Sequence, residues 1–213
     1  MYIFSRTAVV APGKAPAAMA FAVEVAAKAA SISGIPLNVY TAAFGMPLGT
    51  ILWSSRVDSH AQLGEMQAKI LGDAGYMAMV GSASDLFQAG IQDGLTEIVS
   101  TTMAAPAAVV SATQATIANG KIAEAMELGV AIQAAIAKAT GLGTAFCADV
   151  YGAYGGVRWL VGAASMAEVD AGRTAMNADP TFQSLVAKAG DCYLAGSGQI
   201  GLITKINRRP SHG

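Results

Sequence analysis

Residues 50–61 read TILWSSRVDSHA, and residues 156–167 read GVRWLVGAASMA. Trp53 and Trp159, the only two tryptophans in the chain, are 106 residues apart. At the same spacing Ser59 falls on Ser165 and Ala61 on Ala167. Self-similarity at a fixed period is the sequence signature of a repeat. We therefore interpret the chain as a tandem duplication, with repeats at 1–103 and 104–207 and a tail at 208–213.

Both halves have the same predicted order of elements. Strands are rich in β-branched and aromatic residues, helices are rich in alanine, and glycine or proline separates them. In the first half we predict strands at 2–10, 37–44, 50–57 and 95–101, with helices at 16–33, 58–71 and 76–88. In the second half we predict strands at 107–116 and 199–206, a hairpin at 144–163, and helices at 121–139 and from 165 and 179. This order, β-α-β-β-α-β, is that of an α+β ferredoxin-like unit.

The hairpin of the second half contains the best polar pair. A two-residue turn within Gly152–Gly155 would set Ala148 opposite Trp159 and Asp149 opposite Arg158. The same register would set Ala42 opposite Trp53. At the ungapped spacing the first half has Ala43 and Leu52 in place of the charged pair. The pair is either a stabilising cross-strand ion pair or a polar clamp in a binding cavity.

About twenty residues after Trp159 the chain reads Asp179-Pro180-Thr181-Phe182-Gln183. This resembles the Asp-Pro-x-Phe-Gln helix start of NIPSNAP-type proteins, members of the dimeric α+β barrel superfamily that also holds antibiotic-biosynthesis and haem-degrading monooxygenases. The resemblance implies that two ferredoxin-like sheets form a barrel, here within one chain. The haem-degrading branch usually has a histidine where this chain has Val80 and Val186, so we expect neither haem nor metal. The antibiotic-monooxygenase branch often pairs an asparagine with its tryptophan, and the strand of Trp53 has no asparagine.

Composition narrows the classes of function. Charged residues make up 13% of the chain and its net charge is −1, with no basic stretch beyond Arg208-Arg209, which argues against nucleic-acid binding.

The most apolar segment, 15–32, is interrupted by Glu24 and Lys28, so we expect no membrane span. The start of the chain lacks the pattern of a signal peptide, and we expect a cytoplasmic protein. Cys147 and Cys192 are interpreted as buried hydrophobic residues.

Two further motifs are weak. Residues 196–201 match GxGxxG, but they precede a predicted strand, whereas a nucleotide-binding loop follows a strand and opens a helix. The only histidines are His60, in the first turn of a predicted helix, and His212, in the tail. The second half has Met166 at the position of His60, so a site built on His60 would be asymmetric.

The catalytic residues are therefore left open, with Asp149, Arg158 and His60 as candidates. The expected ligand is a small apolar or aromatic molecule, because an otherwise apolar pocket is predicted. Its candidate contacts are Trp53, Trp159, Tyr40, Arg6 and Arg56. Two functions remain open at this stage: a cofactor-independent oxygenase or isomerase, and a non-catalytic binding or assembly protein.

The predicted helices 16–33 and 121–139 suggest an assembly. The first contains only Glu24 and Lys28 as charged residues, although a helix that covers a sheet normally has a polar outward face. Exposed apolar surface of this kind marks an interface. We expect a homodimer or a larger homo-oligomer.

Overall fold

The computed structural model describes residues 1–206 and divides the chain into two compact units. Unit 1 comprises Met1–Gly94 with the chain from Thr204, and unit 2 comprises Leu95–Ile203. The divisions fall inside strands β4 (Gln92–Thr101) and β8 (Gln199–Lys205), whereas the repeat boundary that the sequence predicts, at 103/104, lies between strands. The predicted tail at 208–213 and His212 lie outside the described residues.

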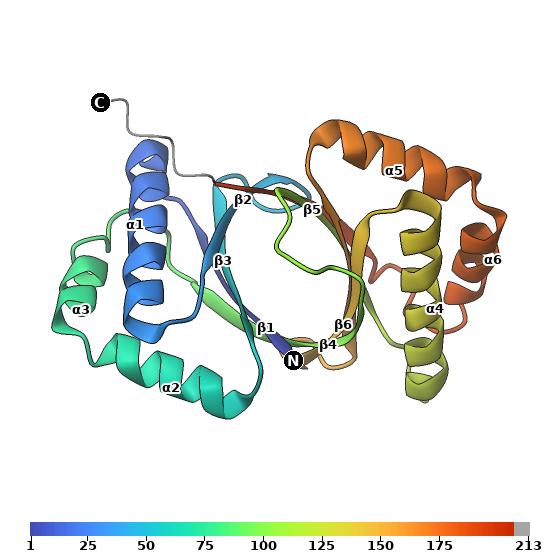
Figure 1. Ribbon diagram of the computed structural model, residues 1–213, viewed down its shortest axis with the longest axis horizontal. Helices are drawn as coiled ribbons and strands as arrows, with labels where there is room; N and C mark the ends of the chain where they lie inside the picture. Colours follow the sequence, from blue (N-terminus) through green and yellow to red (C-terminus); the bar gives the residue numbers. More distant parts are fainter. Residues whose placement is uncertain (207–213) are drawn as a thin grey trace. The chain divides into compact units, whose positions relative to one another are not determined.

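The two units present the same order of elements (Figure 1). Unit 1 contains β1 (Tyr2–Val9), α1 (Ala15–Ser33), β2 (Asn38–Phe44), β3 (Thr50–Val57), α2 (His60–Leu71), α3 (Ala74–Gly81) and the start of β4. Unit 2 contains the rest of β4, β5 (Val109–Thr116), α4 (Ile122–Thr140), β6 (Gly143–Tyr151), β7 (Gly156–Ala163), α5 (Met166–Ala178), α6 (Pro180–Ala189) and most of β8. The sequence thus predicts the elements to within a few residues, except that the helix expected at 76–88 ends at Gly81.

That helix ends early because the chain after it returns to β1. The Ala11 N–H donates to the Leu86 carbonyl at 2.9 Å, and Phe87 pairs with Val10. Lys14 and Asp85 form an ion pair at 2.6 Å in the same segment. Residues 86–88 therefore use their hydrogen bonds on the segment that ends β1, and the helix cannot include them.

The sheet of each unit is antiparallel. Hydrogen-bonded neighbours follow the order β4-β1-β3-β2-β8 in unit 1 and β8-β5-β7-β6-β4 in unit 2. The complete series is the strand order of a closed eight-stranded barrel. In unit 1, α1 packs on β2 and β3, and in unit 2, α4 packs on β6 and α5 on β5 and β7. One face of each unit's strands is thus covered by that unit's own helices.

Helix starts and ends follow the expected capping chemistry. Ser59 and Ser165 accept hydrogen bonds from the backbone N–H groups of Gln62 and Glu168, so each satisfies a donor of its helix's first turn. Asp179, where a helix start is predicted, likewise accepts from the Phe182 N–H at 2.7 Å. Gly34 and Gly141 end α1 and α4 with φ angles of 76° and 69°, a left-handed conformation that favours glycine.

The tryptophans join each sheet to its long helix. Trp53 donates from Nε1 to the Ala22 carbonyl of α1 at 3.0 Å, and Trp159 donates to the Gly129 carbonyl of α4 at 2.9 Å. Both side chains lie in hydrophobic cores, where a buried indole N–H needs an acceptor. The helix-covered face of each sheet is therefore the face on which its tryptophan lies.

The predicted hairpin register is wrong in both units. Trp159 lies opposite Phe146, and Ala148 opposite Val157, because Gly152–Gly155 forms a four-residue loop rather than a two-residue turn. In unit 1 Val39, not Ala42, lies opposite Trp53. The slip in unit 2 is two residues, an even number, so it leaves each side chain on its predicted face of the sheet.

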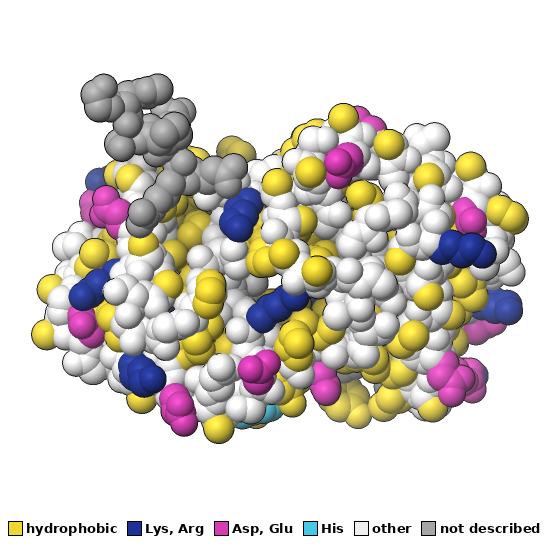
Figure 2. All heavy atoms as spheres, viewed as in Figure 1, with side chains coloured by type: hydrophobic (Ala, Val, Ile, Leu, Met, Phe, Trp, Pro, Cys, Tyr) yellow, Lys and Arg dark blue, Asp and Glu magenta, His cyan; other side chains and the backbone are white. Residues whose placement is uncertain are grey.

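The surface is poor in charge. On the face drawn in Figure 2, charged side chains are scattered among apolar and uncharged atoms. Among the described residues α1 is the one helix long and apolar enough to qualify as a membrane span, but soluble core helices pass the same test. Its inward side, including Ala18, Ala22 and Ala26, is buried in the core of unit 1.

Candidate functional site

Polar side chains gather on the face of unit 2 that its helices do not cover. Directly opposite residues of an antiparallel pair share a face, and successive residues alternate. Trp159 lies on the helix side, so its neighbour Arg158 lies on the other face, where it pairs with Cys147 and Gln114. Asp149, two residues after Cys147, lies there as well. We call this side of the unit 2 strands the pocket face.

Asp149 and Arg158 form the ion pair that the sequence predicts. Arg158 Nη2 contacts Asp149 Oδ1, and the side chains are 27% and 8% exposed, respectively. Thr96 of β4 also donates to Asp149 Oδ1, at 3.3 Å. The Nε atom of Arg158 is buried and has no hydrogen-bond partner within residues 1–206. Asp149 of β6 is therefore held by Arg158 of β7 on one side and by Thr96 of β4 on the other, and its carboxylate is largely shielded from water.

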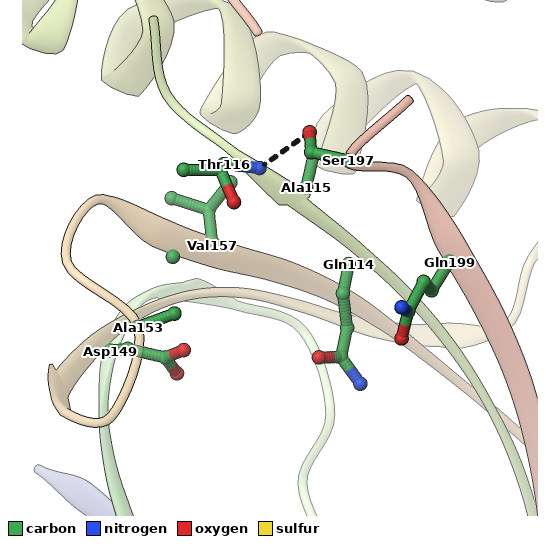
Figure 3. A pocket seen from close by; sticks show the side chains of 9 residues that line it. Gln114, Ala115, Thr116, Asp149, Ala153, Val157, Ser197 and Gln199 are labelled. Carbon is green, nitrogen blue, oxygen red and sulfur yellow. Dashed lines mark hydrogen bonds between the residues drawn. The ribbon is translucent and has the colours of Figure 1, made fainter. Parts of the chain in front are cut away.

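A cavity of about 180 Å³ opens beside Asp149 (Figure 3). Its wall comes from β5, β6, β7, the β6–β7 loop, the loop before β8 and the first residue of β8. The lining residues are Gln114, Ala115, Thr116, Asp149, Ala153, Gly156, Val157, Ser197 and Gln199. In Figure 3 the Gln114 and Gln199 carboxamides are neighbours, and the Asp149 carboxylate lies on the side of the β6–β7 loop. Ser197 Oγ accepts from the Thr116 N–H and donates to the Leu194 carbonyl, so it anchors the loop before β8.

This lining is more polar than the apolar pocket we expected. Two carboxamides, a carboxylate and two hydroxyls converge on the cavity, and its volume is below the roughly 300–1,000 Å³ common for drug-sized ligands. Such a cavity suits a small molecule that both donates and accepts hydrogen bonds. It is less suited to a purely apolar one, because each polar group that a ligand desolvates needs a new partner.

Unit 1 lacks the charged pair. When the two hairpins are aligned by their observed strand pairing, Ala42 corresponds to Asp149 and Leu52 to Arg158. The ungapped sequence comparison instead gives Ala43 for Asp149, because the hairpin loop of unit 1 is one residue longer than that of unit 2. The polar pair is therefore specific to the second half of the chain.

The two tryptophans proposed as ligand contacts lie in the cores. Each is 7% exposed and hydrogen-bonded to its helix, and neither lines the cavity beside Asp149. Tyr40, another candidate, pairs with Leu52, so it faces away from the unit 1 helices, as does Arg56. Burial raises the pKa of the Tyr40 phenol, and the nearby Arg56 cation acts in the opposite direction.

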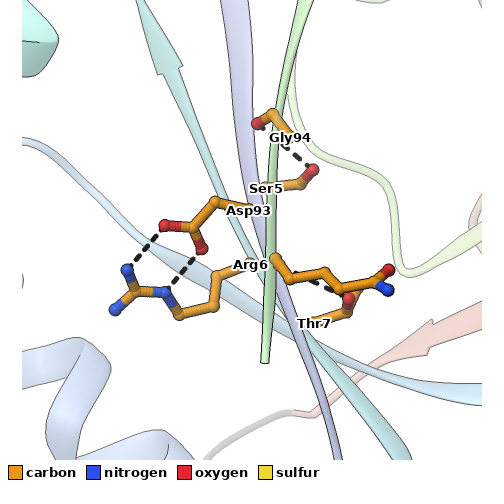
Figure 4. A network of polar contacts seen from close by, with 6 residues as sticks. Ser5, Arg6, Thr7, Asp93 and Gly94 are labelled. Atoms are coloured by element: carbon orange, nitrogen blue, oxygen red, sulfur yellow. Dashed lines mark hydrogen bonds and ion pairs between the residues drawn. The ribbon is translucent and has the colours of Figure 1, made fainter. Parts of the chain in front are cut away.

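Arg6 lies on the helix side of unit 1, because it pairs with Trp53. Its Nε and Nη2 atoms each donate to Asp93 at 2.7 Å (Figure 4), and these hydrogen bonds raise the pKa of Arg6. With Ser5–Gly94 and Thr7–Gln92 contacts at 3.5 Å, this network attaches the start of β4 to β1. Arg6 thus has a structural partner outside the candidate site.

His60 begins α2 and is exposed, with its ring 4.9 Å from that of Tyr2 in an edge-to-face contact. It lies in unit 1 and is separate from the cavity residues. Within residues 1–206 no group of three histidine, cysteine, aspartate or glutamate residues could hold a metal ion. The GxGxxG segment leads into β8 rather than into a helix: residues 196–198 precede the strand, and Gln199, which begins it, contributes to the cavity wall.

Sequence reasoning missed Gln114, Gly156 and Gln199, which line the cavity, and Thr96, which donates to Asp149. A signal for Gln114 was present, because it stands in a strand between the small residues Thr113 and Ala115. Finding it required the pairing of β5 with β7, which the sequence alone does not give. Gln199 follows a glycine-rich loop whose path was equally unknown.

Comparisons with known proteins identify the fold. No family model matches the chain, and no curated protein matches it. A solved structure from Fusobacterium nucleatum, provisionally named a monooxygenase, aligns with a TM-score of 0.73 and 8% identity over 97% of this chain and 92% of its own. An anthrone oxidase-like protein aligns with a TM-score of 0.67 and 13% identity over 97% and 91%.

A NIPSNAP family protein from Agrobacterium tumefaciens also matches, at 18% identity over 44% of this chain and 89% of its own, with a TM-score of 0.38. That likeness is too partial to bear on function. The chain has the dimeric α+β barrel fold, as the Asp179–Gln183 resemblance implied. At these identities the likeness is one of fold, and function has to be argued from the site.

Proposed function

We propose that unit 2 binds a small oxygenated molecule in the cavity beside Asp149 and that the protein is a cofactor-independent enzyme. The observation that carries the proposal is the Asp149 carboxylate itself. It lies at the wall of a polar cavity, is 8% exposed, and is held by Arg158 and Thr96. A buried charged pair is weak evidence of a stabilising role, because replacing it by apolar residues is often neutral. Unit 1 has that apolar replacement, which supports a role in binding for the pair.

The cavity's size and polarity limit the ligand. A cavity of about 150 Å³ can hold benzene, so the 180 Å³ here suits a single ring with small substituents. The Asp149 carboxylate accepts hydrogen bonds, whereas the Gln114 and Gln199 carboxamides can both donate and accept. A ring with a hydroxyl toward Asp149 and a second oxygen toward the carboxamides would satisfy all three groups.

The same arrangement supports a reaction that begins with proton transfer. Asp149 would accept a proton from the ligand's hydroxyl or from an activated C–H group, and the electron pair would remain on the ligand as a phenolate or enolate. An isomerase would return the proton to another carbon. An oxygenase would pass electrons from the anion to dioxygen with formation of a carbon–oxygen bond, and the resulting peroxide would take the proton back from Asp149. The monooxygenase and anthrone oxidase-like names of the similar structures support the oxygenase at the level of fold alone.

Binding of resorcinol, a single ring with two hydroxyls, tests the proposal. We expect resorcinol to shift the side-chain amide signals of Gln114 and Gln199 in ¹H–¹⁵N NMR spectra. We expect Asp149→Asn to weaken this binding about tenfold to a hundredfold, the value of a hydrogen bond to a charged group. The control Asp170→Asn changes an exposed carboxylate of α5 and should leave binding unchanged.

Benzene is the matched apolar ligand. Resorcinol should bind more tightly than benzene, because benzene leaves the carboxylate and the carboxamides without partners. Equal binding of the two compounds, or equal resorcinol binding by the wild type and Asp149→Asn, would contradict the proposed site.

We also propose that the two halves arose by tandem duplication. Three pairs of contacts recur: the serine caps and the Asp73 and Asp179 caps at a spacing of 106 residues, and the tryptophan-to-helix bonds, whose helix acceptors Ala22 and Gly129 are 107 residues apart. The β-α-β-β-α-α-β order recurs as well. On this proposal, the second half acquired the polar pair or the first half lost it.

A homo-oligomer remains part of the proposal. The exposed residues of α1 include Ala17, Met19 and Ala20 and only one charged residue, Glu24. Apolar surface on a helix favours contact with a further protein surface. We therefore expect light scattering at micromolar concentration to give a mass of at least twice 21.5 kDa. A mass of a single chain would show that α1 remains solvated.

A further inference from the structure

Gly156 begins β7 and lies directly beside the Asp149 carboxylate. A Cβ atom at this position would overlap Asp149 Oδ2 and lie 3.1 Å from its Cγ and 2.9 Å from the Ala153 carbonyl oxygen. Real Cβ atoms almost never come within 3.0 Å of another atom, so both Asp149 Oδ2 and, to a smaller extent, the Ala153 carbonyl oxygen would have to move. The carboxylate therefore occupies space that any other residue at position 156 would fill.

The backbone itself does not require glycine here. Gly156 is not among the residues with positive φ, so its conformation is open to other residues. Its counterpart in unit 1 is Thr50, which begins β3 after the matching hairpin loop. The Thr50 N–H donates to the Pro47 carbonyl at 3.1 Å, and the Gly156 N–H donates to the Ala153 carbonyl at 2.9 Å. The same turn thus accepts a side chain in unit 1.

The two units differ at linked positions. Unit 1 combines Thr50 with Ala42, whereas unit 2 combines Gly156 with Asp149. Thr50 is buried, at 3% exposure, and its hydroxyl bonds to the Pro47 carbonyl at 2.7 Å. The first residue of the second hairpin strand therefore has a side chain in unit 1, where the residue across from it is alanine. It is a glycine in unit 2, where the residue across from it is an aspartate.

We infer that Gly156 is a positioning residue for Asp149. The missing side chain leaves room for the carboxylate between the start of β7, the cavity and Arg158. A side chain at 156 would push the carboxylate away from Arg158 and would fill part of the cavity wall. The consequence for ligand binding rests on the proposed function, whereas the effect on Asp149 does not.

The test compares Gly156→Thr in two backgrounds. One is the wild type, and the other is Asp149→Ala with Arg158→Leu, the residues found in unit 1. We expect Gly156→Thr to raise the unfolding equilibrium constant about tenfold to a hundredfold in the wild type, because the site is overpacked. In the second background the increase should be less than about threefold, because the Asp149→Ala change removes the carboxylate and leaves only the approach to the Ala153 carbonyl, in a turn that carries a threonine in unit 1. Urea unfolding followed by tryptophan fluorescence measures both.

An equal increase in the two backgrounds would overturn the inference, since it would place the clash on the backbone and not on Asp149. If Gly156→Thr does not fold, Gly156→Ala provides the same comparison, because its single Cβ meets the same oxygen. Gly198→Ala is the control: a Cβ there meets nothing within 4 Å, so it should behave alike in both backgrounds. Resorcinol binding is measured separately. Loss of the proposed ligand site would show as absent resorcinol binding, whereas loss of the positioning role would show as an equal increase in the unfolding equilibrium constant in the two backgrounds.

Discussion

Phe146→Ala should lower the free energy of unfolding by about 3–5 kcal/mol, the usual cost of truncating a fully buried phenylalanine. Phe146 is 0% exposed and lies in the unit 2 core, with its ring centroid 5.2 Å from that of Trp159. Its ring lies against the α4 backbone at Gly129, where no side chain is available to fill a cavity. Chemical denaturation of the wild type and the variant gives the difference.

The close approach at Gly129 provides the control for this prediction. Alanine is the better helix former, so Gly129→Ala would stabilise an isolated helix by roughly 1 kcal/mol. We expect the opposite here, a loss of about 1–3 kcal/mol, because a Cβ at 129 would overlap the Phe146 ring. Unit 1 has Ala22 and Val39 at these positions, so adding Phe146→Val should relieve the clash. A stabilising Gly129→Ala would show that the ring does not pack as described.

Asp149→Ala should lower the free energy of unfolding by about 3 kcal/mol, the lower end for removing one partner of a buried ion pair. Arg158 is 27% exposed, so its cation would lose its partner without becoming fully hydrated. The Arg158 Nε atom already lacks a hydrogen-bond partner within residues 1–206, and the variant would remove the Nη2 contact as well. Thermal or urea unfolding measures the loss.

The matched control removes both charges. Asp149→Ala combined with Arg158→Leu reproduces the unit 1 residues and should be more stable than Asp149→Ala alone, because no lone cation remains. If the double variant is as unstable as the single one, the cost does not come from the unpaired Arg158. The double variant should fold but lose resorcinol binding, which separates the pair's contribution to stability from its role in the site.

Much of the fold was predictable because local signals agreed. Strands rich in β-branched residues, alanine-rich helices, and the glycine and proline residues between them gave bounds within a few residues of those observed. The Trp53 and Trp159 coincidence led to the matching order of elements in the two halves. The ion pair of Asp149 and Arg158 was also predicted and is confirmed.

The remainder depended on geometry between strands. The hairpin register failed because a four-residue loop replaced the two-residue turn, and the residues alone do not fix loop length. The polar character of the cavity was missed because Gln114 and Gln199 come from strands whose pairing was unknown. The tryptophans were expected at the ligand, whereas each lies on the helix side of its sheet.

A crystal structure of the protein with resorcinol tests the central claim most directly. The account predicts resorcinol in the cavity between Asp149 and Gln114, with a ligand hydroxyl within hydrogen-bond distance of Asp149 Oδ2. Resorcinol bound only elsewhere on the protein, or a cavity without ligand at a saturating concentration, would contradict the claim that this cavity is the functional site.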